Sequence, residues 1–569
     1  MVVGKQTEAP TLAALGALVL LFFLTLWLRL ASSAWDGWAG LHPDERHMVF
    51  VMQDMLTAID QARSSGTGWF DLWWGQQSRA LDPRALGRLY VYGDLPLLSV
   101  LMVARWSSLT DVGSLFWLGR SMTAVVSSSA LLAVFILAWG VGRRSGAALG
   151  AALLLAAAPL WQQLANFYTV DAWLASLSVW ALLPLARFAG PSGQLGDALI
   201  AGFLLGLALA CKVTALALCV PALCAVFLYG RRSGVRASLR ALGLGVIAAC
   251  VVYRLTNPSA FVGLEISSDF VSDFQNLRML SENPQVPSNW QWMLGYSCFS
   301  ILRDFILFAI GPSLAVFVFL WVWLKNARME KFQLLFFAMV AWLIVALSFG
   351  YPELRYFSPL VPIFAVMASF SLVAVRPLWG WGGLLVAVWW GSGVALLHEG
   401  QHPRLMATDW MRDLAPGSVV GFETEWDEAL PLARFPPGKN PILPPGSFNM
   451  LSLRLTDPES DDTPERIAKA LKKIDYLVIS SGRQVETMPR MEKQFPTVAR
   501  YYRALEKGDA CFQKILNIDR GYPLPMLRIN DEFSQESWRV YDHPKVSIWK
   551  KQSCFDYEEL LWILRGDRY

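Results

Sequence analysis

The first 400 residues consist of long apolar runs separated by short polar segments. Residues 11–31 form an unbroken apolar run, close to the roughly 20 residues that a helix needs to cross a bilayer. With the runs that follow, we place spans near 11–31, 117–141, 146–163, 170–189, 197–211, 213–229, 238–255, 303–324, 332–350, 356–375 and 378–397. The pattern predicts an α-helical polytopic membrane protein with about 11 transmembrane helices in residues 1–400.

The segment between the first two spans, about 32–116, mixes polar and apolar residues. Met48, Val51, Met52 and Met55 recur at helical spacing, which predicts an amphipathic helix on the membrane surface. Residues 90–106 are apolar but short, and counting them as a span would place later arginine pairs on the wrong side. We therefore expect a second juxtamembrane helix there.

The positive charges indicate an orientation. If the N-terminus is cytoplasmic, every inside loop contains arginine or lysine, including the pairs Arg143/Arg144 and Arg231/Arg232. An odd number of spans then places the loop that follows the first span and residues 401–569 outside. We expect a multi-pass protein of the bacterial cytoplasmic (inner) membrane, with its active site and C-terminal domain extracytoplasmic.

Residues 401–569 differ in character, with clustered prolines, many charges and short β-rich runs. Residues 418–426, 475–481 and 538–551 are typical of strands, and residues 463–474 of a helix. This alternation predicts a soluble extracytoplasmic α/β domain. Cys511 and Cys554 lie in it and could pair in an oxidising compartment, although two free thiols are an equal alternative.

Composition narrows the classes of function. The chain is 54% hydrophobic and 17% charged, which excludes a single soluble domain. Its net charge of +4 contains no basic tract that would indicate nucleic acid. "GLGVIA" at 243–248 lies within a span, where small residues allow close helix packing, so we do not assign it to a nucleotide site.

A short set of polar residues stands where spans meet the expected external surface: Asp44, Glu45, Asp171, Lys212, Arg254, Arg355 and Tyr356. Ionisable groups near hydrocarbon are costly unless they are paired, hydrated or used. Transfer of a sugar from a lipid phosphate needs a base for the acceptor and cations for the leaving phosphate. Asp44 suits the first role and Lys212 and Arg355 the second.

Structural alternatives remain open for each residue. Asp44 could pair with Arg46 in a solvated loop, Asp171 could be a helix N-cap, and Lys212 and Arg355 could be interfacial anchors. His42 and His47 do not have the spacing of a helical zinc pair. Asp44, Glu45, His47 and Asp171 could instead hold a divalent ion such as Mg²⁺ or Mn²⁺.

The chain resembles the GT-C membrane glycosyltransferases, in particular the superfamily of protein O-mannosyltransferases and aminoarabinose transferases. The resemblance rests on "HPDE" (42–45), "YGDLPLL" (92–98), Gly119 and Arg120, Thr169 to Asp171, "GLALACK" (206–212), "NP" (257–258) and "RYFSPLVP" (355–362). In the C-terminal part, "EWDEALP" (425–431) and "VYDHPKV" (540–546) are similar to bacterial members.

The resemblance implies a GT-C fold and an inverting glycosyltransferase with a polyprenyl-phosphate-linked sugar donor. Asp44 and Asp171 would be its acidic residues, Lys212, Arg355, Tyr356 and Arg254 would contact the donor phosphate, and the acceptor would be a lipid, glycan or protein. Alternatives are an oligosaccharyltransferase-like or polymerase-like member, or a non-catalytic glycan transporter or assembly subunit. A transporter predicts inverted repeats and helices broken in mid-span, and the sequence indicates neither.

Overall fold

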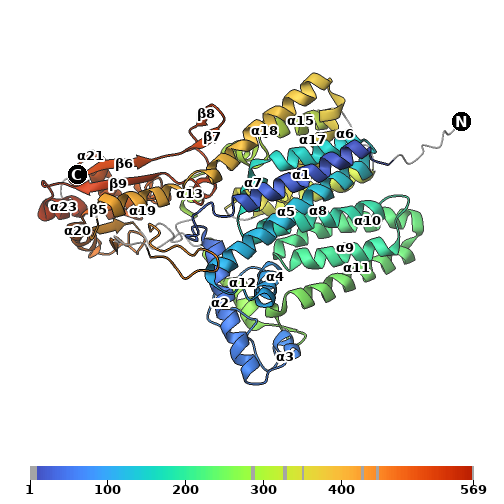
Figure 1. The fold of residues 1–569 in the computed structure, drawn as a ribbon, viewed down its shortest axis with the longest axis horizontal. Helices are drawn as coiled ribbons and strands as arrows, with labels where there is room; N and C mark the ends of the chain where they lie inside the picture. Colours follow the sequence, from blue (N-terminus) through green and yellow to red (C-terminus); the bar gives the residue numbers. More distant parts are fainter. Residues whose placement is uncertain are drawn as a thin grey trace. The chain divides into compact units, whose positions relative to one another are not determined.

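The computed structural model describes residues 9–282, 289–323, 330–348, 351–414, 416–423, 429–443 and 448–566 (Figure 1). The chain forms two compact units. We call the first the helical unit; it comprises Met1–Ser33, His47–Leu277 and Arg303–Val394. The second, the sheet unit, comprises Ala34–Arg46, Arg278–Leu302 and Ala395–Tyr569. The expected boundary at 400/401 lies close to the last of these segments, but the sheet unit also takes two earlier segments.

Among the described residues, six helical stretches are long and apolar enough to cross a membrane. They are α1 (Leu12–Ala31), α5 (Val112–Gly142), α8 (Val170–Phe188), η1 (Val213–Leu218) with α10 (Cys219–Ser233), α11 (Val235–Thr256), and the stretch Pro377–Asp413, which covers α18 (Pro377–Glu399) and α19 (Pro403–Leu414) without its last residue. Three apolar stretches are shorter: α9 (Leu195–Leu209), Phe332–Ser348 within α16 (Glu330–Ser348), and α17 (Leu360–Ala374). These helices confirm a multi-pass, mostly helical membrane protein.

Two further apolar stretches are bent. α6 (Ser145–Ala157) and α7 (Pro159–Asn166) meet at 61°. The stretch formed by α14 (Cys298–Asp304) and η4 (Phe305–Ile310) meets α15 (Pro312–Trp323) at 108°. Pro159 and Pro312 begin the second helix of each pair, where a missing N–H is tolerated. The expectation of unbroken helices is therefore wrong at 146–163 and 303–324.

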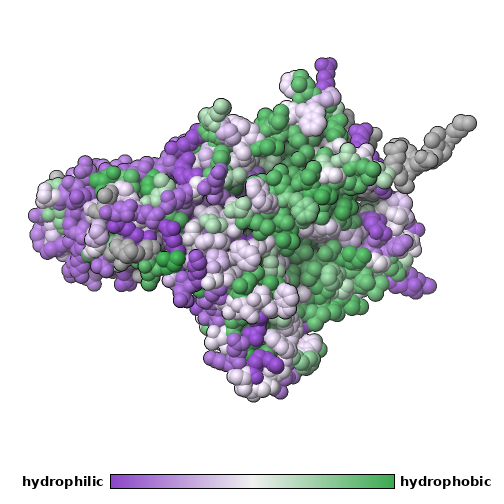
Figure 2. All heavy atoms as spheres, viewed as in Figure 1, coloured by the Kyte–Doolittle hydropathy of each residue, from purple (hydrophilic) through white to green (hydrophobic). Residues whose placement is uncertain are grey.

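Apolar side chains cover much of the outside of the helical unit. Phe23, Trp27, Phe227, Ile247 and Trp381 are all more than 60% exposed, as expected for side chains that face lipid rather than water. Figure 2 shows broad hydrophobic areas over this unit and a mostly hydrophilic surface over the sheet unit.

Small residues set the closest helix packing. A Cβ added at Gly202 of α9 would lie 2.1 Å from the carbonyl oxygen of Gly245 in α11. Only glycine allows the two backbones to approach this closely. Because Gly245 belongs to the 243–248 stretch and lies inside α11, the packing explanation for that stretch is confirmed.

The segment that follows the first span contains the helices α2 (Pro43–Ser64), α3 (Trp69–Trp74) and α4 (Asp94–Ser107). The two expected helices are confirmed, and their position at the membrane surface stays a prediction. α4 is too short to be among the candidate spans. After α11 the chain forms η2 (Pro258–Ala260), a small antiparallel pair of β1 (Phe261–Val262) with β2 (Glu265–Ile266), α12 (Ser268–Glu282) and, later, α13 (Trp290–Met293).

The sheet unit is built on a five-stranded sheet of order β4-β3-β5-β9-β6. Its strands are β3 (Val419–Phe422), β4 (Asn449–Ser452), β5 (Tyr476–Ile479), β6 (Phe512–Ile518) and β9 (Val546–Lys551). β3 is parallel to β4 and β5, whereas β9 is antiparallel to β5 and β6. β7 (Tyr522–Leu524) and β8 (Leu527–Ile529) form a separate hairpin.

Alternate residues of the central strand serve two hydrophobic cores. Leu477 and Ile479 of β5 pack in a core with α20 (Thr463–Lys473), α21 (Pro496–Lys507) and α23 (Tyr557–Arg565). Val478, which points to the other face, packs with α19. The predicted α/β domain and the helix at 463–474 are confirmed, but 538–551 is wrong as one strand. Its first residues belong to α22 (Glu536–Arg539), and only Val546–Lys551 pair in the sheet.

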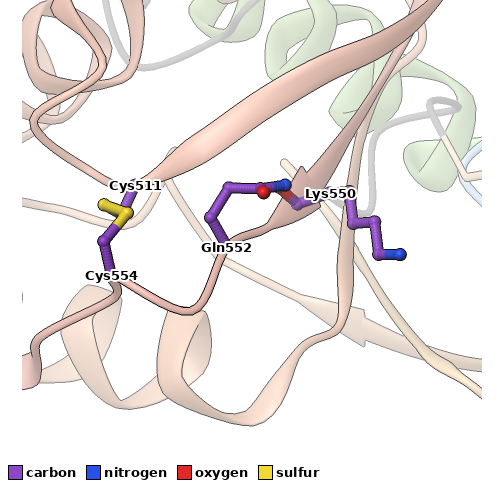
Figure 3. The surroundings of a disulfide bond; sticks show 4 residues. All are labelled: Cys511, Lys550, Gln552 and Cys554. Atoms are coloured by element: carbon purple, nitrogen blue, oxygen red, sulfur yellow. A yellow bond between two sulfur atoms is a disulfide. The ribbon is translucent and has the colours of Figure 1, made fainter.

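Cys511 and Cys554 form a disulfide with a Cα–Cα distance of 5.8 Å. It links the residue before β6 to the turn before α23 (Figure 3). The Gln552 N–H donates to the Cys511 carbonyl over 2.9 Å, and the Gln552 side chain donates to the Lys550 carbonyl over 3.0 Å. The disulfide therefore closes a turn that backbone hydrogen bonds also hold.

Candidate functional site

An ion pair between Lys212 and Asp171 forms the centre of the site in the helical unit. Lys212 Nζ lies 2.9 Å from Asp171 Oδ1, and the side chains are 18% and 4% exposed. Lys212 follows the last turn of α9, and Asp171 lies in the first turn of α8. An ammonium group has three donors, and within the described part of the chain Asp171 accepts one of them.

A tyrosine ring joins this pair to a second cation. Lys212 Nζ lies 4.9 Å from the centroid of the Tyr356 ring, and Arg355 Cζ lies 5.6 Å from the same centroid. Arg355 Nε donates to Glu353 Oε2 over 2.6 Å. Two partly exposed cations, each paired with a carboxylate, therefore flank one aromatic ring, an arrangement suited to a phosphate group.

Backbone contacts fix the position of Lys212. The carbonyls of Ala210 and Cys211, at the end of α9, accept hydrogen bonds from Leu95 and Gly93, each over 2.9 Å. The last carbonyls of a helix lack partners in the helix itself, and the start of α4 supplies them here. A Cβ on Gly93 would lie 2.2 Å from the Ala210 carbonyl oxygen. Backbone hydrogen bonds thus join the "YGDLP" motif directly to the "ACK" motif.

Asp94 ties a third motif to this unit. Its N–H donates to Asn257 over 2.7 Å, and its carboxylate accepts from the Ser259 N–H over 2.8 Å and the Ser259 hydroxyl over 2.7 Å. Asp94 is fully buried. Burial raises the pKa of this carboxyl to about 7, against the lowering effect of the Ser259 hydrogen bonds. We therefore assign Asp94 to holding the loops together.

Tyr168 connects the Thr169–Asp171 motif to the same assembly. Its hydroxyl donates to the Pro96 carbonyl over 3.0 Å. Its ring lies against Gly119, where an added Cβ would come within 2.4 Å of the ring. Six of the motifs noted in the sequence therefore contact one another in the helical unit, and Asp171 and Lys212 belong to two of them.

Arg254 lies in a different cluster. Its Nε donates to the Gly263 carbonyl over 2.8 Å, and its guanidinium carbon lies 4.1 Å from the centroid of the Trp74 ring and 5.2 Å from that of Phe261. These contacts clamp α3 to the end of α11. The predicted contact between Arg254 and donor phosphate is therefore not part of our proposal.

Asp44 and Glu45 lie in the sheet unit, in the first turn of α2. Asp44 is half-buried and Glu45 is fully buried. The Glu45 N–H points to His42 Nδ1 over 3.5 Å, and Arg46 Nη1 donates to the Gly40 carbonyl over 3.0 Å. Asp36 accepts from the N–H groups of Trp38 and Leu41. The chain is therefore tightly held immediately before Asp44.

The structure decides some of the structural alternatives. Thr169, not Asp171, is the N-cap of α8, so the N-cap explanation of Asp171 is wrong. Lys212 and Arg355 both have carboxylate partners. His47 Nε2 lies 2.8 Å from the Leu89 carbonyl oxygen. Among the described residues, no group of three or more His, Cys, Asp or Glu is arranged to hold a metal ion. Asp44 belongs to the sheet unit, whereas His47 and Asp171 belong to the helical unit, and metal binding by these three residues stays a prediction.

Two residues of the site were not singled out from the sequence. Glu353, the partner of Arg355, lies only two residues before it in "YPELRYF". The opposite charges at this close spacing could have indicated the pair. Asp94 stands in "YGDLP", where a glycine, an acid and a proline together mark a helix start. A proline near a helix start indicates the turn, but not the distant serine that the acid contacts.

One family model matches part of the chain. Residues 100–255 match the family model of dolichyl-phosphate-mannose-protein mannosyltransferases. This segment contains Asp171, Lys212 and Arg254, and the match confirms the resemblance seen in the sequence over these residues. No curated protein sequence matches the chain significantly.

Several solved structures are similar at low identity. ArnT from Cupriavidus metallidurans bound to undecaprenyl phosphate is 18% identical, with a TM-score of 0.45, over 70% of this chain and 72% of that chain. The archaeal oligosaccharyltransferase AglB from Archaeoglobus fulgidus, in complex with an inhibitory peptide and a dolichol-phosphate, is 14% identical. Its TM-score is 0.47, over 92% of this chain and 77% of that chain.

Proposed function

We propose that the chain, as a member of the membrane glycosyltransferase superfamily that includes the matched family, transfers a sugar from a polyprenyl-phosphate-linked donor to an acceptor outside the cytoplasm. The Asp171–Lys212 pair carries the proposal. A buried carboxylate holds a partly exposed ammonium within the matched segment, beside an aromatic ring and a second cation. A site of this kind stabilises a departing phosphate.

Lys212 and Arg355 bind the donor phosphate in this mechanism. Lys212 keeps its bond to Asp171 and offers its other N–H groups as a point charge, whereas the planar guanidinium of Arg355 can bind two phosphate oxygens at once. Both cations lie close to the ring of Tyr356, which limits where the phosphate can lie. Negative charge on the leaving phosphate grows during transfer, so both cations bind the transition state more tightly than the ground state.

Asp44 acts as the general base that takes the proton from the acceptor. A single displacement at the anomeric carbon with one base inverts the configuration of that carbon, so the bond to the acceptor and the bond to the phosphate should have opposite configurations. Glu45, in the same helical turn, is the other candidate for the general base. Comparing Glu45→Gln with Asp44→Asn in the assay below shows which carboxylate takes the proton.

The experiment measures transfer of labelled sugar from a panel of polyprenyl-phosphate sugars, including a mannosyl donor, by membranes that contain the intact chain or Asp44→Asn. The substitution keeps the size of the side chain but removes the base, so we expect a loss of at least about a hundredfold in rate. Asp54→Asn is the matched control. Asp54 lies in the same helix and pairs at the surface with Arg88 over 2.7 Å, so its loss should change the rate by less than about twofold.

The outcomes separate the functions. If Asp44→Asn transfers sugar as fast as the intact chain at equal protein level, the base mechanism is wrong. If the intact chain transfers nothing but binds a polyprenyl phosphate in a way that depends on Lys212, a transporter or a non-catalytic assembly subunit explains the site better. Transfer of a preassembled glycan in preference to single sugars would favour the oligosaccharyltransferase-like alternative.

A further inference from the structure

The segment that carries Asp44 belongs to the sheet unit. We call this stretch, Ala34–Arg46, the Asp44 segment. The Trp38 carbonyl accepts from the Phe435 N–H over 2.8 Å. A Cβ on Gly37 would lie 2.9 Å from Leu405 Cδ1, and Gly37 has a φ of +56°. Two different parts of the sheet unit therefore hold its first half.

Tyr541 holds the second half. The rings of His42 and Tyr541 lie 4.2 Å apart, centroid to centroid, at an interplanar angle of 33°. His42 is 2% exposed and immediately precedes α2. The Asp44 side chain begins only two residues after this ring, so the position of the His42 ring fixes the direction in which the first turn of α2 starts.

His402, which follows α18, fixes Tyr541 in turn. His402 Nε2 lies 3.1 Å from the Tyr541 carbonyl oxygen, and His402 Nδ1 accepts from the Arg404 N–H over 3.1 Å. Because Nδ1 accepts this hydrogen bond, the ring proton is on Nε2, which donates to the Tyr541 carbonyl. The Trp35 ring lies 5.7 Å from that of His398 and 5.9 Å from that of His402. The Asp44 segment therefore also contacts these histidines directly.

The two residues after Tyr541 belong to a buried network of acids and histidines. Asp542 contacts His543 Nδ1 and lies 3.2 Å from His398 Nε2, and His543 Nε2 lies 2.8 Å from Asp531. All four side chains are almost fully buried. Burial by itself lowers the pKa of His543, but Asp542 and Asp531 together raise it to about 9. His543 is thus an imidazolium that donates to a carboxylate on each side, which makes this network of side chains rigid.

We propose that Tyr541 is a positioning residue that sets the place of Asp44 through His42. The buried network of Asp531, His543, Asp542 and His398 holds Tyr541 in position. This inference rests on the proposed function, in which Asp44 is the base. It assigns a positioning task to the "VYDHP" stretch of the sheet unit, namely to hold the Asp44 segment. A displacement of about 1 Å at a reacting group can lower a rate by about a hundredfold, so loss of this ring contact is sufficient to affect the chemical step.

The test is a double-mutant cycle with Tyr541→Ala, His42→Ala and the double variant. It uses the intact chain and polyprenyl-phosphate mannose, or the panel member that the intact chain prefers. We expect each single variant to lower kcat about tenfold or more with little change in KM for the donor, and the double variant to lose no more than either single one. Tyr541→Phe keeps the ring and should restore the rate.

Tyr557→Ala is the matched control. Tyr557 is a partly exposed tyrosine of the same unit whose ring lies 5.0 Å from Lys472 Nζ, and its effect should be small and add to that of His42→Ala. A second readout does not require turnover. Hydrogen–deuterium exchange of peptides from the Asp44 segment should become faster in Tyr541→Ala and not in Tyr541→Phe.

The outcomes distinguish the two proposals. If Asp44→Asn is inactive but Tyr541→Ala keeps the kcat of the intact chain, or if losses in the cycle simply add, Tyr541 does not position Asp44. If Asp44→Asn is fully active, the base mechanism fails, and exchange alone then shows whether Tyr541 orders the segment. Unchanged exchange in Tyr541→Ala overturns the inference whatever the activity.

Discussion

Single residues decide the geometry of the Asp171–Lys212 site. Lys212 can face Asp171 only while the end of α9 stays bound to the start of α4, and Gly93 is the residue that allows this contact. A side chain at that position would meet a carbonyl oxygen rather than a flexible side chain, so no small adjustment removes the conflict.

Gly93→Ala tests this contact. We expect at least about a tenfold loss of transfer, because the added Cβ would lie 2.2 Å from the Ala210 carbonyl oxygen and must displace the end of α9. Gly196→Ala is the control, since a Cβ there meets nothing within 4 Å. Size-exclusion chromatography in detergent shows how much folded protein remains. A Gly93→Ala chain with full activity at equal protein level would contradict the explanation.

His543 predicts a pH dependence of stability. Its pKa is about 9 in the folded chain, against 6.5 for the ordinary group. The folded state therefore binds the proton more tightly, and the stabilisation is complete below pH 6.5 and is lost as the pH rises through about 9. The unfolding temperature of the intact chain should fall between pH 7 and 9. His543→Gln should be less stable at pH 7 and lack this decrease, whereas His47→Gln should keep it.

At the scale of elements, close packing of backbones determines the helical unit more than hydrophobicity does. In lipid, apolar side chains gain little from leaving one apolar environment for another, so association depends on close contact and hydrogen bonds. α9 and α11 achieve it where Gly202 faces Gly245.

Gly202→Ala should lower the unfolding temperature of the detergent-solubilised chain. Helix propensity favours alanine over glycine by about 1 kcal/mol, which by itself would raise stability. The added Cβ, however, would lie 2.1 Å from the Gly245 carbonyl oxygen, and the helices must separate. Gly243→Ala in α11 meets nothing within 4 Å and should be neutral or slightly stabilising. Equal effects of the two changes would show that close packing is not the cause.

At the scale of the whole molecule, the disulfide bears on the compartment of the sheet unit. Disulfides persist in oxidising compartments and are rare in the cytosol. A bond between Cys511 and Cys554, 43 residues apart, therefore agrees with the proposed extracytoplasmic location of this unit. By the loop-entropy argument a closed loop of this length stabilises the fold by about 4 kcal/mol.

Mass mapping after alkylation tests both points. In membranes alkylated without reduction, we expect the peptides with Cys511 and Cys554 to be recovered linked and unmodified. The double change of Cys511 and Cys554 to Ser should lower the free energy of unfolding by up to about 4 kcal/mol. Alkylation of both cysteines in the native chain would place the sheet unit in a reducing compartment and contradict the proposed orientation.

The sequence by itself determined what depends on neighbouring residues. The lengths of apolar runs predicted the positions of the membrane helices, and helical spacing of apolar residues predicted α2. Thr463 and Pro464 indicated the start of α20, and a β-rich run predicted the central strand of the sheet. The bends at Pro159 and Pro312 escaped this reading, because a hydropathy average over a span does not change when the helix axis turns.

Only the tertiary structure decided which distant residues meet. Lys212 and Asp171 are separated by 41 residues, and His42 and Tyr541 lie near opposite ends of the chain. Their pairing depends on how whole helices and sheets pack, a nonlocal free energy that no short pattern contains. Arg254, like Lys212, lies at the end of an apolar run, but helix packing places it where it clamps α3 to the end of α11. Packing likewise decides that the Asp44 segment belongs to the sheet unit.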